Sequence, residues 1–216
     1  MASRDDVTAV EEFVHRYEPG AGPVTLLLLH GTGGDEHQLI DLGRQLAPEA
    51  ALLSPRGAVL EDGVAARFFA RRGIGDLDLD DLRRRGDDLA AWVGEACLQY
   101  ERDPARVIAL GYSNGANIGV ELLFRHPGVL RAAALLRPML PYRPDWPLEL
   151  TGTDVLIATG DADPYSPRAQ VAELAELLAG GGAVVQVERQ PTGHGLVQAD
   201  LDALATWMRP RVSDRQ

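Results

Sequence analysis

Short, continuous apolar runs alternate with amphipathic stretches along almost the whole chain, and this rhythm constrains the fold more than any other feature. Within each run the apolar residues occupy successive positions instead of every second one, which is typical of strands that are covered on both faces. Such strands belong to a parallel sheet between layers of helices. The predicted strands cover residues 24–29, 51–54, 106–111, 132–137, 154–160 and 183–188.

The stretches between these runs carry helical patterns. Ser166 and Pro167 predict an N-cap followed by a first-turn proline, and the glycines at 180–182 predict a helix end. The segment 13–20 is expected to add an edge strand. The alternation as a whole predicts an α/β fold, a mostly parallel doubly wound sheet with helices on both faces. The predicted helices cover about residues 36–47, 79–101, 114–125, 168–180 and 197–208.

Length and charge limit the classes of protein and partner. We expect a single domain over residues 1–216, with frayed termini at 1–12 and 210–216. A formal charge of −11 argues against nucleic acid or an anionic membrane as the main partner. Without a secretion signal or an apolar run near the roughly 20 residues of a membrane span, the expected location is cytoplasmic. Cys97 falls on an apolar helical pattern, which predicts a buried, unreactive thiol. Whether the chain forms a homodimer stays an open question at this point.

The segment GYSNG, residues 111–115, places Ser113 between two glycines where a strand is expected to turn into a helix. An ordinary helix N-cap would explain a serine there. The pattern G-x-S-x-G also matches a nucleophile elbow, in which small neighbours allow a tight turn that exposes the serine oxygen. The choice depends on whether the chain also supplies a base, an orienting acid and oxyanion donors.

Two later loops supply candidates for the base and the acid. Of the five histidines, only His194 lies downstream of the later strands, and it is flanked by glycines. Asp161 and Asp163 both follow the strand 154–160, and we prefer Asp163 because it lies farther along the loop, where it can reach an imidazole. The order Ser113, Asp163, His194 is that of α/β-hydrolases. In it the serine attacks a carbonyl, the histidine moves the proton and the aspartate orients the imidazole.

The glycine-rich segment HGTGG, residues 30–34, follows the strand 24–29. Its bare backbone allows the N–H of Thr32 or Gly33 to point into the site as an oxyanion donor. The N–H of Asn114, at the positive end of a helix, is the expected partner donor. The segment lacks the Lys-Ser/Thr ending of a P-loop and does not match G-x-G-x-x-G, so nucleotide binding is disfavoured. We expect no metal and no cofactor.

Together these segments resemble the lidless carboxylesterase/phospholipase group of the α/β-hydrolase superfamily, which includes the acyl-protein thioesterases and related bacterial esterases. The resemblance extends from about residue 24 to about 207. It implies an α/β-hydrolase fold without a cap domain, a catalytic triad of Ser113, Asp163 and His194, and Thr32 and Asn114 as oxyanion donors. Acyl-protein thioesterases commonly have Gln where this chain has Asn114. The segments that carry the resemblance are LLHGTGGDEHQL, LSPRG, RFFARR, GYSNGANI, LLRPMLPY, GDADPYSP and GHGL.

The substrate pocket is expected to be open. Residues 137–153 separate two predicted strands and carry four prolines, so they are too short and too interrupted to form a helical lid. The segment around Phe68, Phe69 and Arg71 is a candidate wall: the phenylalanines would line an acyl or aryl pocket and the arginine would meet an acidic group. The alternative is that the rings pack in the core and the arginines face solvent. Further candidates for the pocket edge are Met139 and Tyr165.

These features predict a serine hydrolase of the carboxylesterase or thioesterase type (EC 3.1). It would cleave small-molecule esters or thioesters of short-to-medium acyl groups through an acyl-enzyme at Ser113. Two other hypotheses stay open, since one fold supports many functions. The chain could be a non-catalytic, ligand-binding member of the fold. It could also use the same triad as an acyltransferase or a cofactor-free oxygenase.

Overall fold

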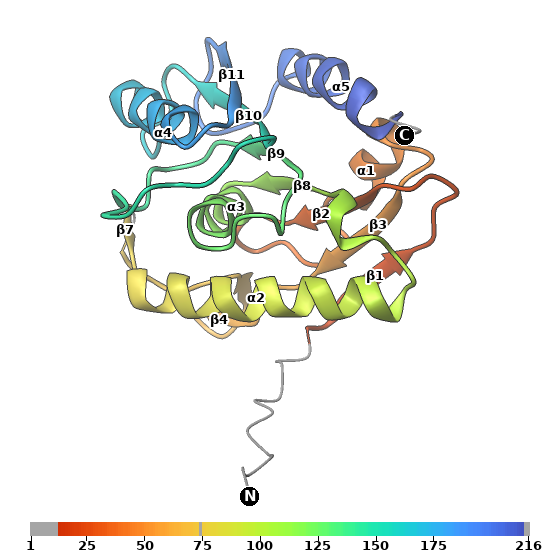
Figure 1. Cartoon of the computed structure of the whole chain (residues 1–216). Helices are drawn as coiled ribbons and strands as arrows, with labels where there is room; N and C mark the ends of the chain where they lie inside the picture. The colour runs from red at the N-terminus through yellow and green to blue at the C-terminus, as the bar shows by residue number, and fades with distance from the viewer. Residues whose placement is uncertain (1–12, 74, 214–216) are drawn as a thin grey trace, which may run out of the picture.

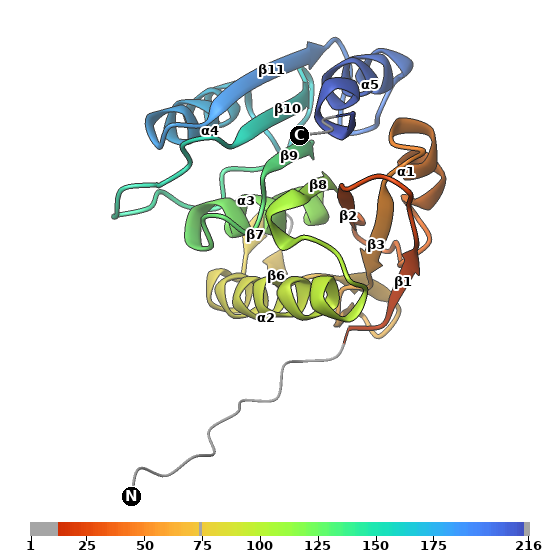
Figure 2. The same ribbon diagram turned by 45° about the vertical axis from the view of Figure 1, so that its right-hand side comes forward.

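A seven-stranded sheet forms the centre of the fold, with helices on both of its sides (Figures 1 and 2). The computed structural model describes residues 13–73 and 75–213. All neighbouring strands pair in parallel except the first pair, β1 with β3, so the mostly parallel, doubly wound α/β prediction is confirmed. The order across the sheet is β1 (His15–Glu18), β3 (Ala51–Pro55), β2 (Thr25–Leu29), β8 (Val107–Tyr112), β9 (Ala132–Leu136), β10 (Asp154–Gly160) and β11 (Val184–Gln190).

The helices divide between the two faces of the sheet. Along β2, Leu27 and Leu29 belong to the hydrophobic cluster of one face, while Leu26 and Leu28 belong to that of the other. Both sets are fully buried, and this explains why the strand sequences are continuously apolar. The first cluster includes side chains of α2 (Leu79–Gln99), α3 (Asn114–Arg125) and α4 (Arg168–Gly180), and the second those of α1 (Ile40–Leu46) and α5 (Gln198–Val212).

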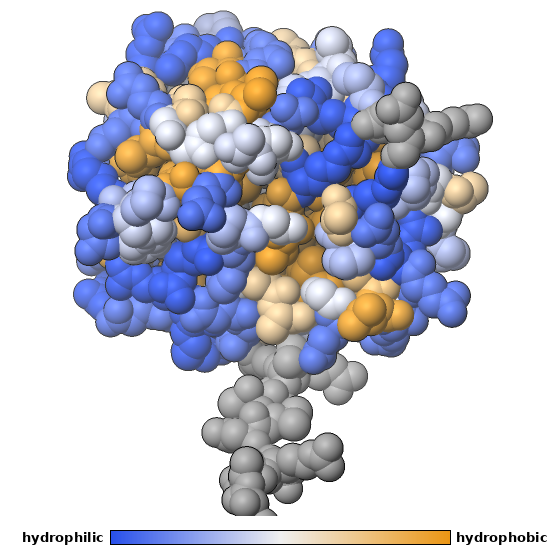
Figure 3. All heavy atoms as spheres, in the orientation of Figure 1, coloured by the Kyte–Doolittle hydropathy of each residue, from blue (hydrophilic) through white to orange (hydrophobic). Residues whose placement is uncertain are grey.

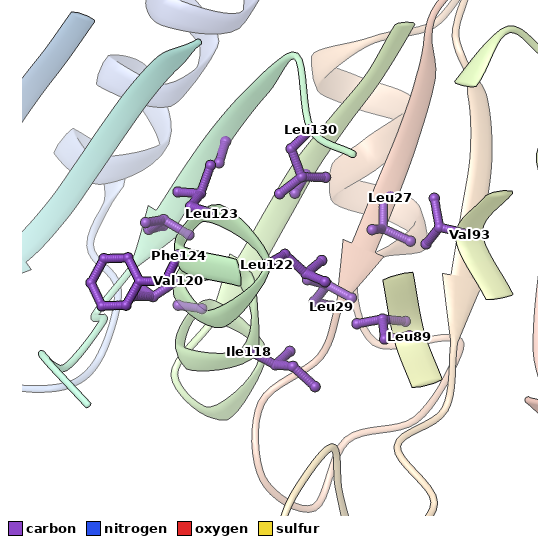
Figure 4. Close-up of a cluster of buried hydrophobic side chains, with 14 of the residues drawn as sticks. Leu27, Leu29, Leu89, Val93, Ile118, Val120, Leu122, Leu123, Phe124 and Leu130 are labelled. Carbon is purple, nitrogen blue, oxygen red and sulfur yellow. The ribbon is translucent and has the colours of Figure 1, made fainter. Parts of the chain in front are cut away.

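The core between α2, α3 and the sheet fixes the position of α3. Figure 4 shows Val93 of α2 beside Leu27, and Leu122 of α3 beside Leu29. Burying one such side chain stabilises the fold by about 1.5–3 kcal/mol. Because α3 packs so closely on β2, the turn that precedes it at residue 113 has little freedom.

Local elements differ from the predicted ones in three places. The helix expected from residue 36 begins at Ile40, after a series of turns. Ser166 does not cap α4; its hydroxyl donates to the carbonyl of Pro138 (2.6 Å), and Pro167 takes the N-cap position. The sequence pattern also did not predict the 3₁₀ turn η1 (Pro104–Arg106) or two small two-stranded hairpins. These hairpins are β4 (Val59–Glu61) with β5 (Ala65–Arg67), and β6 (Arg71–Gly73) with β7 (Asp76–Leu77).

The ends of the chain correct one prediction. Residues 1–12 and 214–216, for which fraying was predicted, lie outside the described residues. Residues 210–213 were also predicted to fray, but α5 continues to Val212. It is held there because Arg211 binds the carboxylate of Asp154 (2.9 Å) and lies 4.1 Å from the ring centre of Trp207.

Two further predictions agree with the structure. Residues 137–153 contain neither helix nor strand, so no cap covers the sheet at this point. The thiol of Cys97 is buried, and that burial raises its pKa. Hydrophilic side chains cover most of the face shown in Figure 3. Within the described part of the chain, no helix combines the length and apolar character needed to cross a bilayer.

Candidate active site

Three polar side chains meet at the carboxyl edge of the sheet. Ser113 follows β8 directly, Asp163 lies just beyond the end of β10, and His194 lies just beyond the end of β11. Because these strands are parallel neighbours of β9 or of one another, their carboxyl ends open onto the same edge. This is the edge at which α/β sheets bind ligands.

The backbone at Ser113 is strained in the way a tight strand-to-helix turn requires. Its φ of 53° and ψ of −112° fall in a region that residues other than glycine rarely adopt. The turn is held by a hydrogen bond from the Ser113 N–H to the carbonyl of Leu136 (2.8 Å). A Cβ on Gly115 would lie 2.0 Å from the carbonyl oxygen of Leu29, so only glycine lets α3 begin this close to β2.

The hydroxyl of Ser113 does not cap the helix that follows it. It lies 2.9 Å from Nε2 of His194, and Nδ1 of His194 lies 2.8 Å from Oδ2 of Asp163. With the proton on Nδ1, the imidazole donates to Asp163 and accepts from Ser113. The geometry therefore favours the elbow interpretation of GYSNG over the helix cap.

Asp163 and His194 are themselves held in place. The carboxylate of Asp163 is buried, and its second oxygen, Oδ1, accepts from the N–H of Tyr165 (2.9 Å). The ring of Tyr165 meets the imidazole edge-on at 5.0 Å, and the hydroxyl of Tyr112 donates to the carbonyl of His194 (3.3 Å). By contrast, Asp161 is exposed and none of the described contacts of its carboxylate reaches the imidazole.

The other histidines are bonded elsewhere. His30 is buried, which lowers its pKa; its Nδ1 donates to the carbonyl of Gly31 and its Nε2 accepts from the N–H of Gly57. His30 is therefore neutral and ties the loop after β2 to the loop after β3. The other three histidines also have partners away from Ser113: His15 contacts Tyr100, His37 contacts Arg16, and His126 contacts Asp87.

The hydrogen bonds of the loop after β2 distinguish the candidate oxyanion donors, the N–H groups of Thr32 and Asn114, from the N–H groups beside them. The N–H of Gly33 donates to the carbonyl of Ala66 (2.9 Å) and that of Gly31 to the side chain of Gln38 (2.8 Å), so neither is free. Among the described residues, no acceptor is found for the N–H of Thr32 or of Asn114. The N–H of Gly33 is therefore taken, and Thr32 stays the predicted donor of this loop.

A cavity of about 280 Å³ opens beside Ser113. Arg71, Met139 and Tyr165, predicted as pocket residues, do line it. A larger hollow of about 950 Å³ lies at the opposite, amino edge of the sheet, away from all three polar side chains. The lining of the smaller cavity is Thr32, Arg67, Arg71, Gly75, Leu77, Tyr112, Ser113, Asn114, Asn117, Arg137, Met139, Tyr165 and His194.

Phe68 and Phe69 do not line this cavity, which corrects the prediction of an aromatic wall. Both rings are buried in the core, Phe68 at 4.7 Å from the ring of His30. Instead, the hairpin β4–β5 presents Arg67, a residue that no sequence motif indicates. Its guanidinium donates to the hydroxyl of Thr32 (2.6 Å) and to the carbonyl of Phe69 (3.1 Å).

Five more residues of the cavity wall were not predicted, namely Gly75, Leu77, Tyr112, Asn117 and Arg137. The positions of Tyr112 and Asn117, one before and four after Ser113, are a signal that could have found them, because a helix places residues four apart on one face. Among the described residues, no cluster of His, Cys, Asp and Glu has the arrangement of a metal site.

A doubly wound sheet without a cap is the architecture of an α/β-hydrolase when a serine, an aspartate and a histidine follow in that order along the chain and are hydrogen-bonded through the histidine at the carboxyl edge. The similarities of the chain to known proteins agree. It is 41% identical over 198 residues to a Bacillus subtilis protein named "Putative hydrolase MhqD", covering 92% of this chain and 98% of that protein. No protein-family model matches it.

Two solved carboxylesterase structures are similar along most of the chain. The Bacillus cereus enzyme has a TM-score of 0.88 and 38% identity, covering 91% of this chain and 93% of its own. The Mesorhizobium loti enzyme has a TM-score of 0.79 and 35% identity, covering 88% and 90%. The chain therefore belongs to the lidless carboxylesterase/phospholipase group of the α/β-hydrolase superfamily. These relatives support ester hydrolysis as its general class of reaction.

Proposed function

We propose that this protein is a serine hydrolase that cleaves carboxylic esters and thioesters of short-to-medium acyl groups through an acyl-enzyme on Ser113. One observation carries the proposal: Oγ of Ser113 lies 2.9 Å from Nε2 of His194, whose Nδ1 lies 2.8 Å from Asp163. A serine hydroxyl is a weak nucleophile until a neighbouring base takes its proton, and this arrangement supplies that base.

In the first half of the reaction, Oγ of Ser113 forms a bond to the carbonyl carbon of the ester while His194 takes the hydroxyl proton. The negative charge moves to the carbonyl oxygen, where the N–H groups of Thr32 and Asn114 are the proposed donors. Asp163 stabilises the imidazolium and keeps Nδ1 protonated. His194 then gives its proton to the departing alcohol or thiol, and the acyl group stays on Ser113.

In the second half, a water molecule takes the place of the leaving group. His194 accepts a proton from the water as its oxygen attacks the acyl carbon, and returns that proton to Oγ when the acid departs. A cavity of about 280 Å³ with no cap above it fits a small acyl group better than a long chain.

The test uses p-nitrophenyl acetate, p-nitrophenyl butyrate and a fluorophosphonate probe. The protein should hydrolyse both esters and form a covalent adduct with the probe, and Ser113→Ala should lose the adduct and at least about 10³-fold in kcat/KM. The matched control is Ser213→Ala, because Ser213 lies after α5 beside the distant hollow. An unchanged rate in Ser113→Ala contradicts the proposal.

The other two hypotheses predict different results. A ligand-binding protein without activity would stay unlabelled by the fluorophosphonate while folded. An acyltransferase would give acylated acceptor in place of free acid, and an oxygenase would consume O₂. Comparing kcat/KM for a thioester and an oxygen ester with the same acyl group shows which kind of ester the protein prefers.

A further inference from the structure

The charge of the cavity wall is opposite to that of the protein. The chain has a formal charge of −11, yet the residues that line the cavity include Arg67, Arg71 and Arg137 and no Asp or Glu. Three positive charges next to the proposed catalytic serine raise the question of which negatively charged groups balance each of them.

Two of these arginines have carboxylate partners of their own. Arg137 is fully buried and binds both oxygens of Asp200, at 3.1 and 2.5 Å. Arg71 binds both oxygens of Glu61, at 2.6 and 3.0 Å. Each forms the two-pronged pair that a guanidinium prefers with a carboxylate.

Arg67 has no such partner. It is 3% exposed, and its Nε and Nη1 donate to neutral oxygens of Phe69 and Thr32. The nearest carboxylate is Glu61 at 3.8 Å, which Arg71 already occupies. Nη2 of Arg67 has no acceptor in the part of the chain that the structure describes. Burial and the nearby Arg71 lower its pKa, which fits a cation whose charge is incompletely balanced.

A second donor on the same wall lacks an acceptor. The side-chain oxygen of Asn114 accepts from the N–H of Phe68 (2.7 Å), which fixes the orientation of the amide. The amide nitrogen, Nδ2, is buried without a hydrogen-bond partner among the described residues. A buried donor of this kind costs about 1–3 kcal/mol unless an acceptor arrives.

We propose that the substrate is an ester that carries a carboxylate, and that Arg67 binds this carboxylate in the cavity beside Ser113. Arg67 is then a specificity-determining residue of the reaction proposed above, and the inference rests on that function. The carboxylate supplies both the missing negative charge and acceptor oxygens for unpaired donors, in the geometry that a guanidinium recognises.

The experiment compares two esters of equal length, the mono-p-nitrophenyl ester of adipic acid and p-nitrophenyl hexanoate. The protein should prefer the adipate ester by about tenfold or more in kcat/KM, as one charge-assisted contact allows. A parallel arm places the carboxylate on the alcohol side: the butyryl ester of 4-hydroxybenzoate against its methyl ester. This arm shows which side of the scissile bond faces Arg67.

Two variants move the preference in opposite directions. Arg67→Met should lower the ratio of kcat/KM values about tenfold. Because Arg67 also holds Thr32, this variant slows both esters, and the ratio cancels that shared effect. Glu61→Gln removes the carboxylate nearest Arg67, and should raise the ratio several-fold. Arg72→Met is the control, since Arg72 is exposed and outside the cavity lining.

The outcomes distinguish the inference from the function beneath it. Equal kcat/KM values for charged and neutral esters in both arms overturn the inference and leave the hydrolase intact. Equal ratios in wild type, Arg67→Met and Arg72→Met also overturn it. If Arg67→Met does not fold, an unchanged ratio in Glu61→Gln has the same meaning. Failure to hydrolyse any of the four esters, with no fluorophosphonate adduct, overturns both.

Discussion

At the scale of single residues, Asp163 illustrates how one carboxylate serves both a fold and a site. One oxygen accepts from its own loop, at the N–H of Tyr165, and the other faces Nδ1 of His194. Removing the charge while keeping the shape therefore tests the second contact alone. An amide at this position can present its NH₂ to the imidazole and so favour the wrong tautomer.

We expect Asp163→Asn to lower kcat for p-nitrophenyl butyrate by about 10³–10⁴-fold with little change in Tm. Asp161→Asn is the matched control, since Asp161 is exposed in the same loop, and its activity should stay within about twofold of wild type. Steady-state kinetics and thermal unfolding of both variants check the pair. A strong loss in Asp161→Asn, with none in Asp163→Asn, would reverse the assignment made from the sequence.

The residues of this site differ in how far the sequence could reveal them. Ser113 and His194 stand out because tight turns at strand ends leave a glycine pattern that is visible in one dimension. Arg67 leaves no such pattern, because its proposed role depends on a hairpin of three-residue strands and on which oxygens surround its side chain. The burial of Phe68 and Phe69 depends on the same hairpin, so the sequence could not separate a pocket wall from a core.

At the scale of elements, the long strands and helices were predictable and the loop structure was not. Six strands match within one or two residues. For β2, β3, β8, β9 and β10 the reason is burial on both faces, which requires an unbroken apolar run, whereas β11 lies at the edge of the sheet and is only partly buried. The late start of α1, at Ile40, has a different cause. Turns precede it because Gln38 bonds the N–H of Gly31, and Glu36 bonds Arg56 at 2.5 and 2.7 Å. Those contacts come from tertiary structure, which periodicity does not encode.

The ion pair between Glu36 and Arg56 joins the loop after β2 to the loop after β3, and its contribution to stability depends on pH. The hydrogen bond with Arg56 lowers the pKa of Glu36 from 4.5 to about 2. A lowered pKa stabilises the fold fully above the unfolded value of 4.5, and this stabilisation is lost as pH falls towards 2. Glu36→Gln should therefore reduce the free energy of unfolding by about 1–2 kcal/mol at pH 6.

The difference between wild type and Glu36→Gln should shrink steadily between pH 5 and pH 2. Urea unfolding at several pH values measures it, with Glu149→Gln as the control, because Glu149 is exposed and has no ion pair among the described residues. A pH-independent difference, or an equal effect of the two substitutions, would show that the pair with Arg56 is not the cause.

At the scale of the whole molecule, a buried ion pair connects the C-terminal helix to the site. Arg137 follows β9 and binds Asp200 of α5, and both side chains are fully buried. Arg137 also donates to the carbonyl of Gly195, next to His194 (2.9 Å), and Asp200 accepts from the N–H of Val197 (2.9 Å). These contacts hold the loop that carries His194 between the end of β9 and the start of α5, two elements that are far apart in the sequence.

Breaking this pair should cost far more than the pair itself contributes, because one charge would stay buried without its partner. We expect Asp200→Asn to lower the free energy of unfolding by about 3–5 kcal/mol, and Tm by roughly 6–20 °C for a chain of this size. Asp202→Asn, at an exposed position of the same helix, should change Tm by no more than about 2 °C. Urea and thermal unfolding of both variants provide the comparison.

The decisive variant removes both charges. In Arg137→Met/Asp200→Leu neither ion is left unpaired, so the double variant should lose less stability than the sum of Arg137→Met and Asp200→Leu, by about 2–4 kcal/mol. Arg137→Met removes the contact to Gly195, Asp200→Leu removes the contact to Val197, and the double variant removes both. These two losses therefore cancel in the cycle, and the difference isolates the coupling of the two charges. Additive losses would mean that the ion pair is not what holds α5 against the sheet, and that apolar packing around Trp207 and Met208 suffices.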